Sequence, residues 1–507
     1  MKKKLLFNFT QSLFRKRNFC ITAFVVFTLF TVQTTFAQKW NVMASENEIA
    51  TVASCYTSIA VVGDVPYVAY VEAAYSAGAT GPGKVKMKNP STGLWEQVGS
   101  NLSALAGFTK LYKDKVGDLY VTYIDRNTSY KLAVKKLVGG VWVPLSTGND
   151  FVSTAAGTAT YGASDARGDL AFDKDNIPYI AYSERVSTTS GNAYVKRFVN
   201  NAWETVGGGP ISSDVFAAGN GIAFDSDNIP YAVYIQQAAS NSGTGVIKTF
   251  RFANNSWEDI SPVSPVAPGT ATTGATSSVR HTSIAIDDTN SPVITYFNTT
   301  SAKGTSIRLA DKITKSWSWL GDISTRDTNR NMLINDSAGN LYTIFQDALI
   351  GSGTSATVRV FKKASGASAF TELQNIPITS ESLVGIDAAG QNVITAATKS
   401  IVTATIALGS DATKPYIVYA KTNSLGVVTP VVRVFEPSTV NVTDNGTTVV
   451  MENGIVKATI TKATATVTSL VYNGLEMIQG GYGGGSIYWS WNMPNYQNPS
   501  SCTYSLI

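Results

Sequence analysis

The stretch LAFDKDNIPYIAYSE at 170–184 decides the fold, because it returns almost unchanged as IAFDSDNIPYAVYIQ at 222–236. About seven such copies, at a spacing of roughly 50 to 75 residues, are typical of a radially repeated β architecture. The looser copies are VVGDVPYVAYVE (61–72), YKDKVGDLYVTYID (112–125), AIDDTNSPVITYF (285–297), INDSAGNLYTIFQD (334–347) and SDATKPYIVYAK (410–421).

Each copy continues in the same way, with a short alternating run holding Lys or Arg, a turn, and a run with Trp or Phe. The best examples are YVKRFVNNAWETV (194–206) and IKTFRFANNSWEDI (247–260). Alternation, β-branched and aromatic enrichment, and Asn, Gly or Ser turns indicate strands and hairpins. Four strands per unit follow: an apolar inner strand, the PYxAY strand, a basic strand and a Trp strand. The sequence therefore predicts an all-β protein containing a seven-bladed β-propeller.

The two ends of the repeated region complement each other. The seventh copy ends at VVRVFEP (431–437) without a Trp strand, whereas QKWNV (38–42) is a Trp strand without a unit of its own. We expect Trp40 to Val42 to complete the last blade, which leaves no open sheet edge. This closure places the propeller at 38–437.

The first 37 residues have the composition of a secretory signal. A basic head precedes the apolar run FCITAFVVFTLF, and Thr35 and Ala37 supply small residues before Gln38. The apolar run is too short for a stable membrane span. Cleavage near Ala37 predicts a protein that is secreted, periplasmic or at the cell surface.

Removal of this signal changes the charge balance. It takes away six basic residues and no acidic ones, so the formal net charge of +5 becomes −1. No polybasic patch remains, which argues against nucleic acid and anionic membranes as partners. We expect a monomer that meets an acidic polysaccharide through locally placed Arg and Lys.

Two cysteines, Cys55 and Cys502, remain after cleavage. Two cysteines cannot make a disulfide scaffold, although an exported compartment permits disulfides. They either pair with each other or, being near opposite ends of the mature chain, stay independent.

Within the blades, most repeated residues have a structural interpretation. Tyr179 and Tyr182 recur as Tyr231 and Tyr234, which indicates packing between blades rather than a ligand site. The phrase beginning at Asp173 resembles the start of a calcium loop, but Ile and Pro occupy positions that need a ligand and a Gly. We therefore interpret it as a tight turn capped by Asp. No cofactor or metal is predicted, since calcium has no complete loop in its support.

His281 is the one histidine of the chain, so mechanisms that need two imidazoles have no place in this propeller. This counts against copper oxidases of the galactose oxidase type and metal-dependent oligogalacturonate lyases. The D-x-G-x-T-W turn of sialidases is missing too. His281 is either a general base near the channel or a structural hydrogen-bonding residue.

Arg126, Arg185 and Arg280 lie next to predicted blade strands, on expected loops. Arginine binds a sugar carboxylate in a bidentate manner. These residues either line a ligand-binding face or are solvated loop arginines.

After Pro437 the pattern changes to short strands separated by Asn-Gly turns, so a second β domain over 438–507 is predicted. The phrases MENGIVKATITK (451–462), TSLVYNGLEMI (468–478) and GGSIYWSWN (484–492) resemble the opening of the rhamnogalacturonan lyases. Ser490 stands where that family has an acidic residue between two tryptophans.

The resemblance implies the beginning of a galactose-mutarotase-like β-sandwich that acts on pectin by β-elimination. The Lys and His of that family lie well downstream of these phrases, and no residue here matches them. We expect the catalytic residues to lie beyond this chain, which has the character of the front part of a longer protein. Trp489 and Trp491 are then either sandwich core or a carbohydrate-binding platform.

Three hypotheses remain open at this stage. The propeller binds or positions pectin for a lyase domain; or it is a non-catalytic module that binds glycan or protein at the cell surface; or it is itself the lyase. The missing histidine partners weaken the third, and the C-terminal phrases favour the first.

Overall fold

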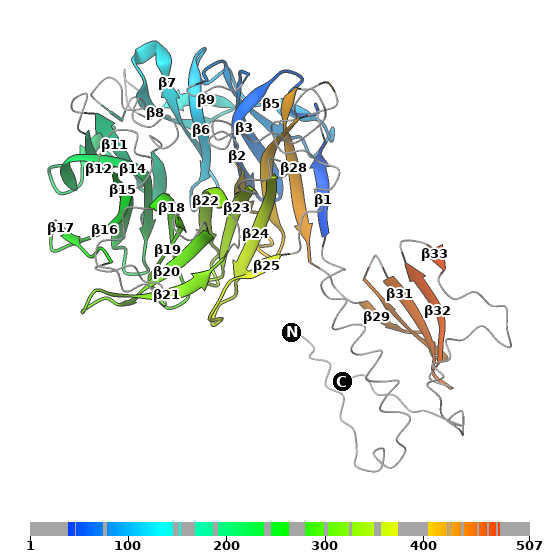
Figure 1. The fold of residues 1–507 in the computed structure, drawn as a ribbon. Coiled ribbons are helices and arrows are strands. Elements are labelled where there is room, and N and C mark those ends of the chain that lie inside the picture. The colour runs from blue at the N-terminus through cyan, green and yellow to red at the C-terminus, as the bar shows by residue number, and fades with distance from the viewer. Residues whose placement is uncertain are drawn as a thin grey trace. The chain divides into compact units, whose positions relative to one another are not determined.

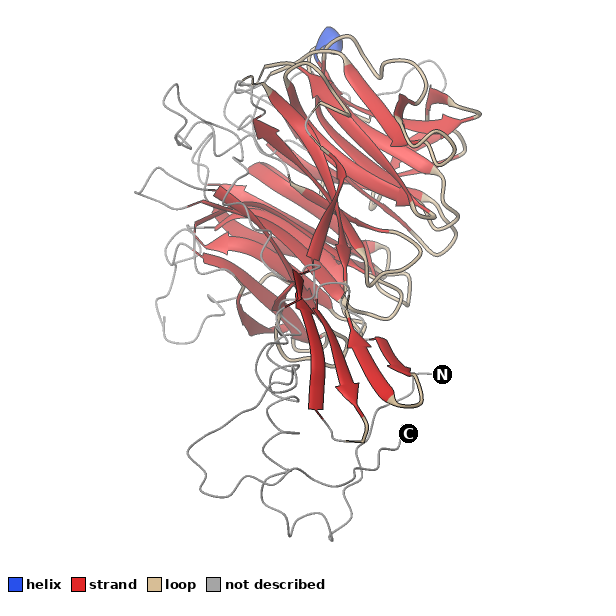
Figure 2. Ribbon diagram, turned by 90° about the vertical axis from the view of Figure 1, so that its right-hand side faces the viewer, coloured by secondary structure: helices blue, strands red, loops and turns tan. Residues whose placement is uncertain are grey.

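The structure is a computed structural model, and its described residues lie almost entirely in antiparallel strands, as Figure 2 shows, with one short 3-10 helix among them, η2 (Arg126–Thr128). No described helix has the length and apolar character needed to span a membrane. The described residues are 39–476, apart from 46, 75–78, 146–151, 154–167, 186–190, 238–244, 263–278, 299–302, 324–326, 349–355, 374–403, 423–424, 426, 438–440, 454–455, 464–465 and 473–474.

Trp40–Phe435 forms one compact unit, in which seven four-stranded blades surround a common centre (Figure 1). Blade 1 is β2 (Ser54–Val62), β3 (Val65–Glu72), β4 (Gly83–Lys88) and β5 (Trp95–Gln97). Blade 2 is β6 (Ala106–Lys113), β7 (Leu119–Asp125), β8 (Lys131–Val138) and β9 (Val141–Pro144). Blade 3 is β10 (Asp169–Phe172), β11 (Pro178–Arg185), β12 (Gly191–Val199) and β13 (Ala202–Thr205).

The remaining blades follow the same order. Blade 4 is β14 (Ser212–Phe224), β15 (Pro230–Gln237), β16 (Gly245–Ala253) and β17 (Ser256–Asp259). Blade 5 is β18 (Val279–Ile286), β19 (Pro292–Asn298), β20 (Lys303–Asp311) and β21 (Ser316–Asp322). Blade 6 is β22 (Asp327–Asn335), β23 (Leu341–Ala348), β24 (Ala356–Lys363) and β25 (Thr371–Leu373).

Blade 7 closes the ring and confirms the predicted exchange of strands. It comprises β26 (Thr405–Leu408), β27 (Pro415–Thr422) and β28 (Val428–Glu436), and β1 (Lys39–Ala44) pairs with β28 as the fourth strand. A propeller of seven blades closed by its N-terminal strand is therefore the architecture of this unit.

The repeated phrase forms the hairpin between the first two strands of a blade. Asp173 accepts hydrogen bonds at Oδ1 from the backbone N–H groups of Asp175 (2.9 Å) and Ile177 (2.8 Å). Asn176 adopts a positive φ of 63°, which Asn tolerates better than most residues. These bonds confirm the Asp-capped turn.

The core lies largely between neighbouring blades. One cluster joins Val71 of blade 1, Val121 of blade 2 and Ile180 of blade 3, all fully buried. Tyr182 and Tyr231 have no exposed surface either. The repeated tyrosines are thus packing residues, as predicted.

A second unit follows Phe435 and is described by itself. Its five strands form one antiparallel sheet in chain order, in which Ala458 is buried and every residue of the second strand is half-buried. Trp489, Trp491 and Cys502 lie outside the described residues. The strands are β29 (Asn441–Asp444), β30 (Thr448–Glu452), β31 (Val456–Thr461), β32 (Thr466–Tyr472) and β33 (Leu475–Glu476).

Candidate functional site

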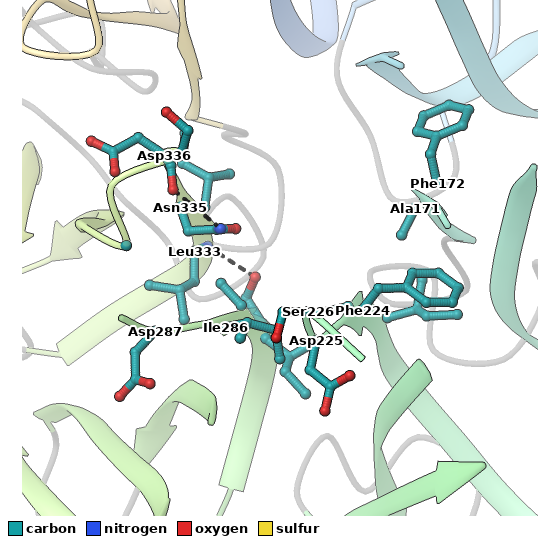
Figure 3. Close-up of a pocket in the computed structure, with 18 of the residues that line it drawn as sticks. Ala171, Phe172, Phe224, Asp225, Ser226, Ile286, Asp287, Leu333, Asn335 and Asp336 are labelled. Atoms are coloured by element: carbon teal, nitrogen blue, oxygen red, sulfur yellow. Dashed lines mark hydrogen bonds between the residues drawn. The ribbon is translucent and has the colours of Figure 1, made fainter. Parts of the chain in front are cut away.

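The propeller contains a cavity of about 850 Å³, whose lining comes mainly from the first strands of blades 2 to 6 and from the turns that follow them, with Ser365 added from the turn after β24. Figure 3 shows part of it, with Phe172 and Ala171 across from Asn335 and Asp336. Its size lies within the range of small-molecule sites. The Asp-capped turns form one end, and residues farther back on the first strands, such as Lys110 of β6 and Asp169 at the start of β10, form the other.

Lysines are concentrated on the wall contributed by blades 2 and 3. Lys110 and Lys113 belong to β6, whereas Lys115 and Lys174 sit on the turns after β6 and β10. Lys113 is exposed, and its ammonium donates to the carbonyl oxygen of Leu408 at 3.3 Å. Desolvation lowers the pKa of Lys113, and the Asp64 carboxylate opposes that change.

The carboxylates on the other walls already have partners. Asp225 accepts from Lys312 Nζ at 2.9 Å, and Asp287 accepts from Arg308 Nε at 2.6 Å. Asp336 accepts from the backbone N–H of Asn340 at 2.9 Å. The acidic side of the cavity is therefore neutralised or engaged. On the lysine wall, Lys110 and Lys174 are themselves ion-paired with Asp169 and Asp175, so that Lys113 and Lys115 supply its net positive charge.

At the inner end, Lys110, Tyr112 and Asp169 form a polar cluster. The Lys110 ammonium makes an ion pair with Oδ1 of Asp169, and the Tyr112 hydroxyl lies 3.1 Å from the same oxygen and 3.0 Å from the carbonyl oxygen of Gly168. Oδ2 of Asp169 accepts the backbone N–H of Ile222 at 3.2 Å. Burial, and secondarily Asp169, raise the pKa of Tyr112 well above its ordinary value. Tyr112 is thus a neutral donor.

Two phenylalanines supply apolar surface on the same side as the lysines. Phe172 and Phe224 are half-buried and line the cavity. The ring centroid of Phe172 lies 4.9 Å from that of Tyr120, and the ring centroid of Phe224 lies 4.9 Å from that of Tyr179. Figure 3 shows Phe172 and Phe224 on the same side of the cavity. Aromatic faces beside a few polar groups are typical of ligand sites.

The structure places the sequence-predicted arginines at the other end of the strands. Arg126 is exposed in η2, where Nη1 donates to Thr80 Oγ1 at 3.2 Å and the guanidinium lies 5.2 Å from the ring centroid of Tyr130. The preceding residue, Asp125, pairs with Ala106 at the start of β6. The cavity turn follows the opposite end of β6, so Arg126 does not line the cavity.

Arg185 and Arg280 lie within strands, not on the loops that were expected. Arg185 is the last residue of β11 and pairs with Gly191, and Arg280 is the second residue of β18 and pairs with Phe297. His281 follows in the bulge between Arg280 and Ser283. By backbone position, all three lie toward the end of their strands that is remote from the Asp-capped turns.

Sequence reasoning missed Lys110 and Asp169 because they belong to no motif, and it treated Tyr112 only as the first residue of the repeated phrase at 112–125. A signal was nevertheless present in the sequence. It appears when the copies are aligned and the residue about nine positions before the first residue of each PYxAY strand is compared between them. At that position Ser58 and Ser283 stand in two copies, whereas Lys110 and Asp169 stand in two consecutive ones.

The cluster offers ammonium donors, a hydroxyl donor and a carboxylate acceptor, a set that binds hydroxyl and carboxylate groups. In the ranges that the structure describes, no group of three or more His, Cys, Asp or Glu side chains is arranged to hold a metal ion. Cys55 is a free, buried thiol, and its burial raises its pKa to about 12.

Comparisons with known proteins give similarities of fold. No protein-family model and no curated protein matches the chain. The alpha-L-arabinanase of Penicillium chrysogenum is 12% identical with a TM-score of 0.41, over 66% of this chain and 98% of that one. An ulvan lyase is 12% identical with a TM-score of 0.45, over 77% and 95%. A Dyadobacter fermentans protein of unknown function is 9% identical with a TM-score of 0.42, over 79% and 98%. These values support no inference about substrate or reaction.

Proposed function

We propose that this chain is an exported protein that binds acidic plant polysaccharide of the rhamnogalacturonan type through the propeller cavity. The lysine wall carries the proposal, with its net positive charge supplied by Lys113 and Lys115, because Lys110 and Lys174 are ion-paired with Asp169 and Asp175. A chain of sugar acids presents carboxylates at regular intervals, and ammonium groups on flexible stems bind such charges. The C-terminal likeness to rhamnogalacturonan lyases points to the same substrate class.

The charge distribution supports an orientation for the ligand. Because Asp225 and Asp287 are held by Lys312 and Arg308, a sugar acid that enters the cavity meets little uncompensated negative charge there. Phe172 and Phe224 supply an apolar surface next to the lysines, against which the C–H face of a sugar ring can pack. The carboxylates of the ligand would therefore face blades 2 and 3.

The groups in the cavity favour binding over elimination within the propeller. Removal of the C5 proton of a uronate needs a base whose pKa lies near the working pH. The raised pKa of Tyr112 keeps its proton in place, and its hydroxyl is already hydrogen-bonded. We therefore assign the propeller a binding role, either for a lyase domain related to the C-terminal sheet or as a non-catalytic module.

The decisive experiment compares the full chain with a charge variant on immobilised rhamnogalacturonan, polygalacturonate and neutral arabinan. The variant is Lys113→Gln with Lys115→Gln and Lys174→Gln. We expect retention on the acidic polymers to fall roughly tenfold, and to weaken with added salt in the wild type. Retention on arabinan should be low throughout.

A matched control removes the same charge elsewhere. Lys84, Lys248 and Lys303 pair with Glu72, Asp259 and Asp322 on blade strands and do not line the cavity. Their triple glutamine variant should bind like the wild type. Equal losses in the two triple variants, or no retention of the wild-type chain on either acidic polymer, would refute the proposed function.

A further inference from the structure

Seven residues occupy equivalent positions on the first strands of the blades, and we call them the inner-strand ring. Each pairs with the residue at the fourth position of its PYxAY motif, as Ser58 pairs with Ala69 and Asp169 with Ala181. The equivalence follows from strand register and is independent of residue type. In blade order the members are Ser58, Lys110, Asp169, Gly221, Ser283, Met332 and Thr405.

Four members share one structural task. The side-chain oxygen of each accepts a backbone N–H from the first strand of the next blade, which ties neighbouring blades together. The bonds run from Leu111 to Ser58 Oγ (3.0 Å), Ile222 to Asp169 Oδ2 (3.2 Å), Leu333 to Ser283 Oγ (2.9 Å) and Ile59 to Thr405 Oγ1 (3.0 Å).

Lys110 and Asp169 are the two charged members, and they are neighbours in the ring. Ser58, Ser283 and Thr405 hold the next blade with neutral hydroxyls, so a carboxylate is unnecessary for that bond. Gly221 and Met332 have no side-chain oxygen or nitrogen, which shows that a blade also tolerates the position without a polar group. The charges of Lys110 and Asp169 therefore exceed what the fold requires.

The pair retains hydrogen-bonding capacity toward the cavity that both residues line. A carboxylate offers about four acceptor sites, and Lys110, Tyr112 and Ile222 address three of those of Asp169. An ammonium has three donors, of which the Lys110 ion pair uses one. Side-chain exposures of 20% for Lys110 and 18% for Asp169 leave room for a ligand to approach.

We propose that Lys110 and Asp169 bind two adjacent hydroxyl groups of one sugar residue at the inner end of the cavity. Each hydroxyl both donates and accepts, so one donates to Asp169 while the other accepts from Lys110. Because the pair is neutral overall, it selects hydroxyls, whereas the exposed lysines toward the turns take the carboxylates. The inference rests on the proposed function and assigns the sugar hydroxyls to a defined pair.

The test replaces the pair by the residue type that other blades use. The variant Lys110→Ser with Asp169→Ser keeps a hydroxyl for Ile222 and removes both charges. We expect its melting temperature to stay within about 3 °C of the wild type, because a partly buried ion pair contributes little net stability. Its affinity for trigalacturonate, measured by calorimetry on the full chain, should fall at least roughly tenfold.

Two further variants keep the result interpretable. Ser58→Ala removes the equivalent inter-blade hydrogen bond of blade 1, away from the cavity lining. Its affinity and melting temperature show how much is lost when only this structural bond is removed. Asp169→Asn keeps a side-chain oxygen and the size of the side chain. If the double serine variant does not fold, the affinity of Asp169→Asn for trigalacturonate tests the inference instead, with the same expected loss. Unchanged affinity in whichever variant folds overturns the inference.

A neutral galactan trisaccharide separates this inference from the proposed function. If trigalacturonate binding depends on Lys113 and Lys115 but not on Lys110 and Asp169, the hydroxyl pair is refuted and the function stands. If the wild-type chain binds the neutral trisaccharide through the pair and does not bind trigalacturonate, the acidic substrate class is refuted and the pair stands.

Discussion

The Arg433 guanidinium donates from Nη1 to the carbonyl oxygen of Trp40 at 2.9 Å, across 393 positions of sequence. Its Nε also donates to the Tyr419 hydroxyl at 2.8 Å. The ring centroids of Trp40 and Phe435 are 5.1 Å apart. Arg433 is 7% exposed, so these bonds are shielded from water. A buried cation therefore fixes the N-terminal strand to the last blade.

The first prediction concerns this closure. Arg433→Met keeps an apolar stem of similar length and removes two hydrogen bonds donated by a buried cation, so the free energy of unfolding should fall by about 2 to 4 kcal/mol. The control Arg197→Met removes interactions of an exposed guanidinium, with Tyr179 and, at 3.5 Å, with Glu204, and should cost under about 1 kcal/mol. Denaturant unfolding measures both, and equal losses would contradict a special role for Arg433.

A second prediction concerns the outer strands, where a tryptophan joins adjacent blades. Trp142 Nε1 donates to the Val98 carbonyl oxygen at 2.9 Å, whereas the equivalent Nε1 of Trp203 is buried and has no hydrogen-bond partner among the described residues. Both changes to Phe remove a similar ring volume, but only Trp142→Phe also removes a hydrogen bond. Trp142→Phe should therefore lower the free energy of unfolding by about 1 kcal/mol more than Trp203→Phe. Thermal melting of the two single variants gives the comparison, and the reverse order would refute the explanation.

The third prediction uses the asparagines of the turns. Asn176 and Asn255 both have positive φ, but Asn176 Oδ1 also accepts the N–H of Lys115 from the previous blade at 3.0 Å. Its Nδ2 donates to Asp114 at 2.8 Å. Glycine tolerates the backbone conformation, so Asn255→Gly should change stability by a few tenths of a kcal/mol and Asn176→Gly by about 1 to 2 kcal/mol. Indistinguishable unfolding midpoints would show that the contact between turns contributes nothing.

The fourth prediction is a loss of stability in acid. Hydrogen bonds from Lys315 and then Arg251 lower the pKa of Glu258 below its ordinary 4.5. A lowered folded-state pKa contributes stability above the unfolded value and loses it as pH falls through the folded value. The melting temperature should therefore decline below about pH 4.5, and less steeply in Glu258→Gln. Glu204→Gln serves as the control, and an identical acid slope in both variants would contradict this assignment.

Most of the propeller could be predicted from sequence, because each blade repeats a local pattern. Alternation specifies strands, Asp and Asn specify the turns, and seven copies specify a ring. Even the exchange of strands followed from a Trp strand without a unit and a unit without a Trp strand. Strand ends were predicted less well, since Arg185 and Arg280 lie inside strands.

The candidate site could not be predicted in the same way. Arg126, Arg185 and Arg280 attracted attention by residue type, yet the cavity opens among the turns at the other end of the strands. Lys110 and Asp169 are 59 positions apart and carry no motif. Only strand register shows that they are equivalent members of adjacent blades.

The sequence by itself determined the β-propeller, its number of blades and the strand that closes it, because these depend on periodic patterning that each segment carries locally. The tertiary structure alone decided which face holds the cavity, which acidic groups are neutralised, and that Lys110 meets Asp169. Those properties depend on contacts between blades, and such contacts arise only when the ring has closed and has brought distant strands side by side.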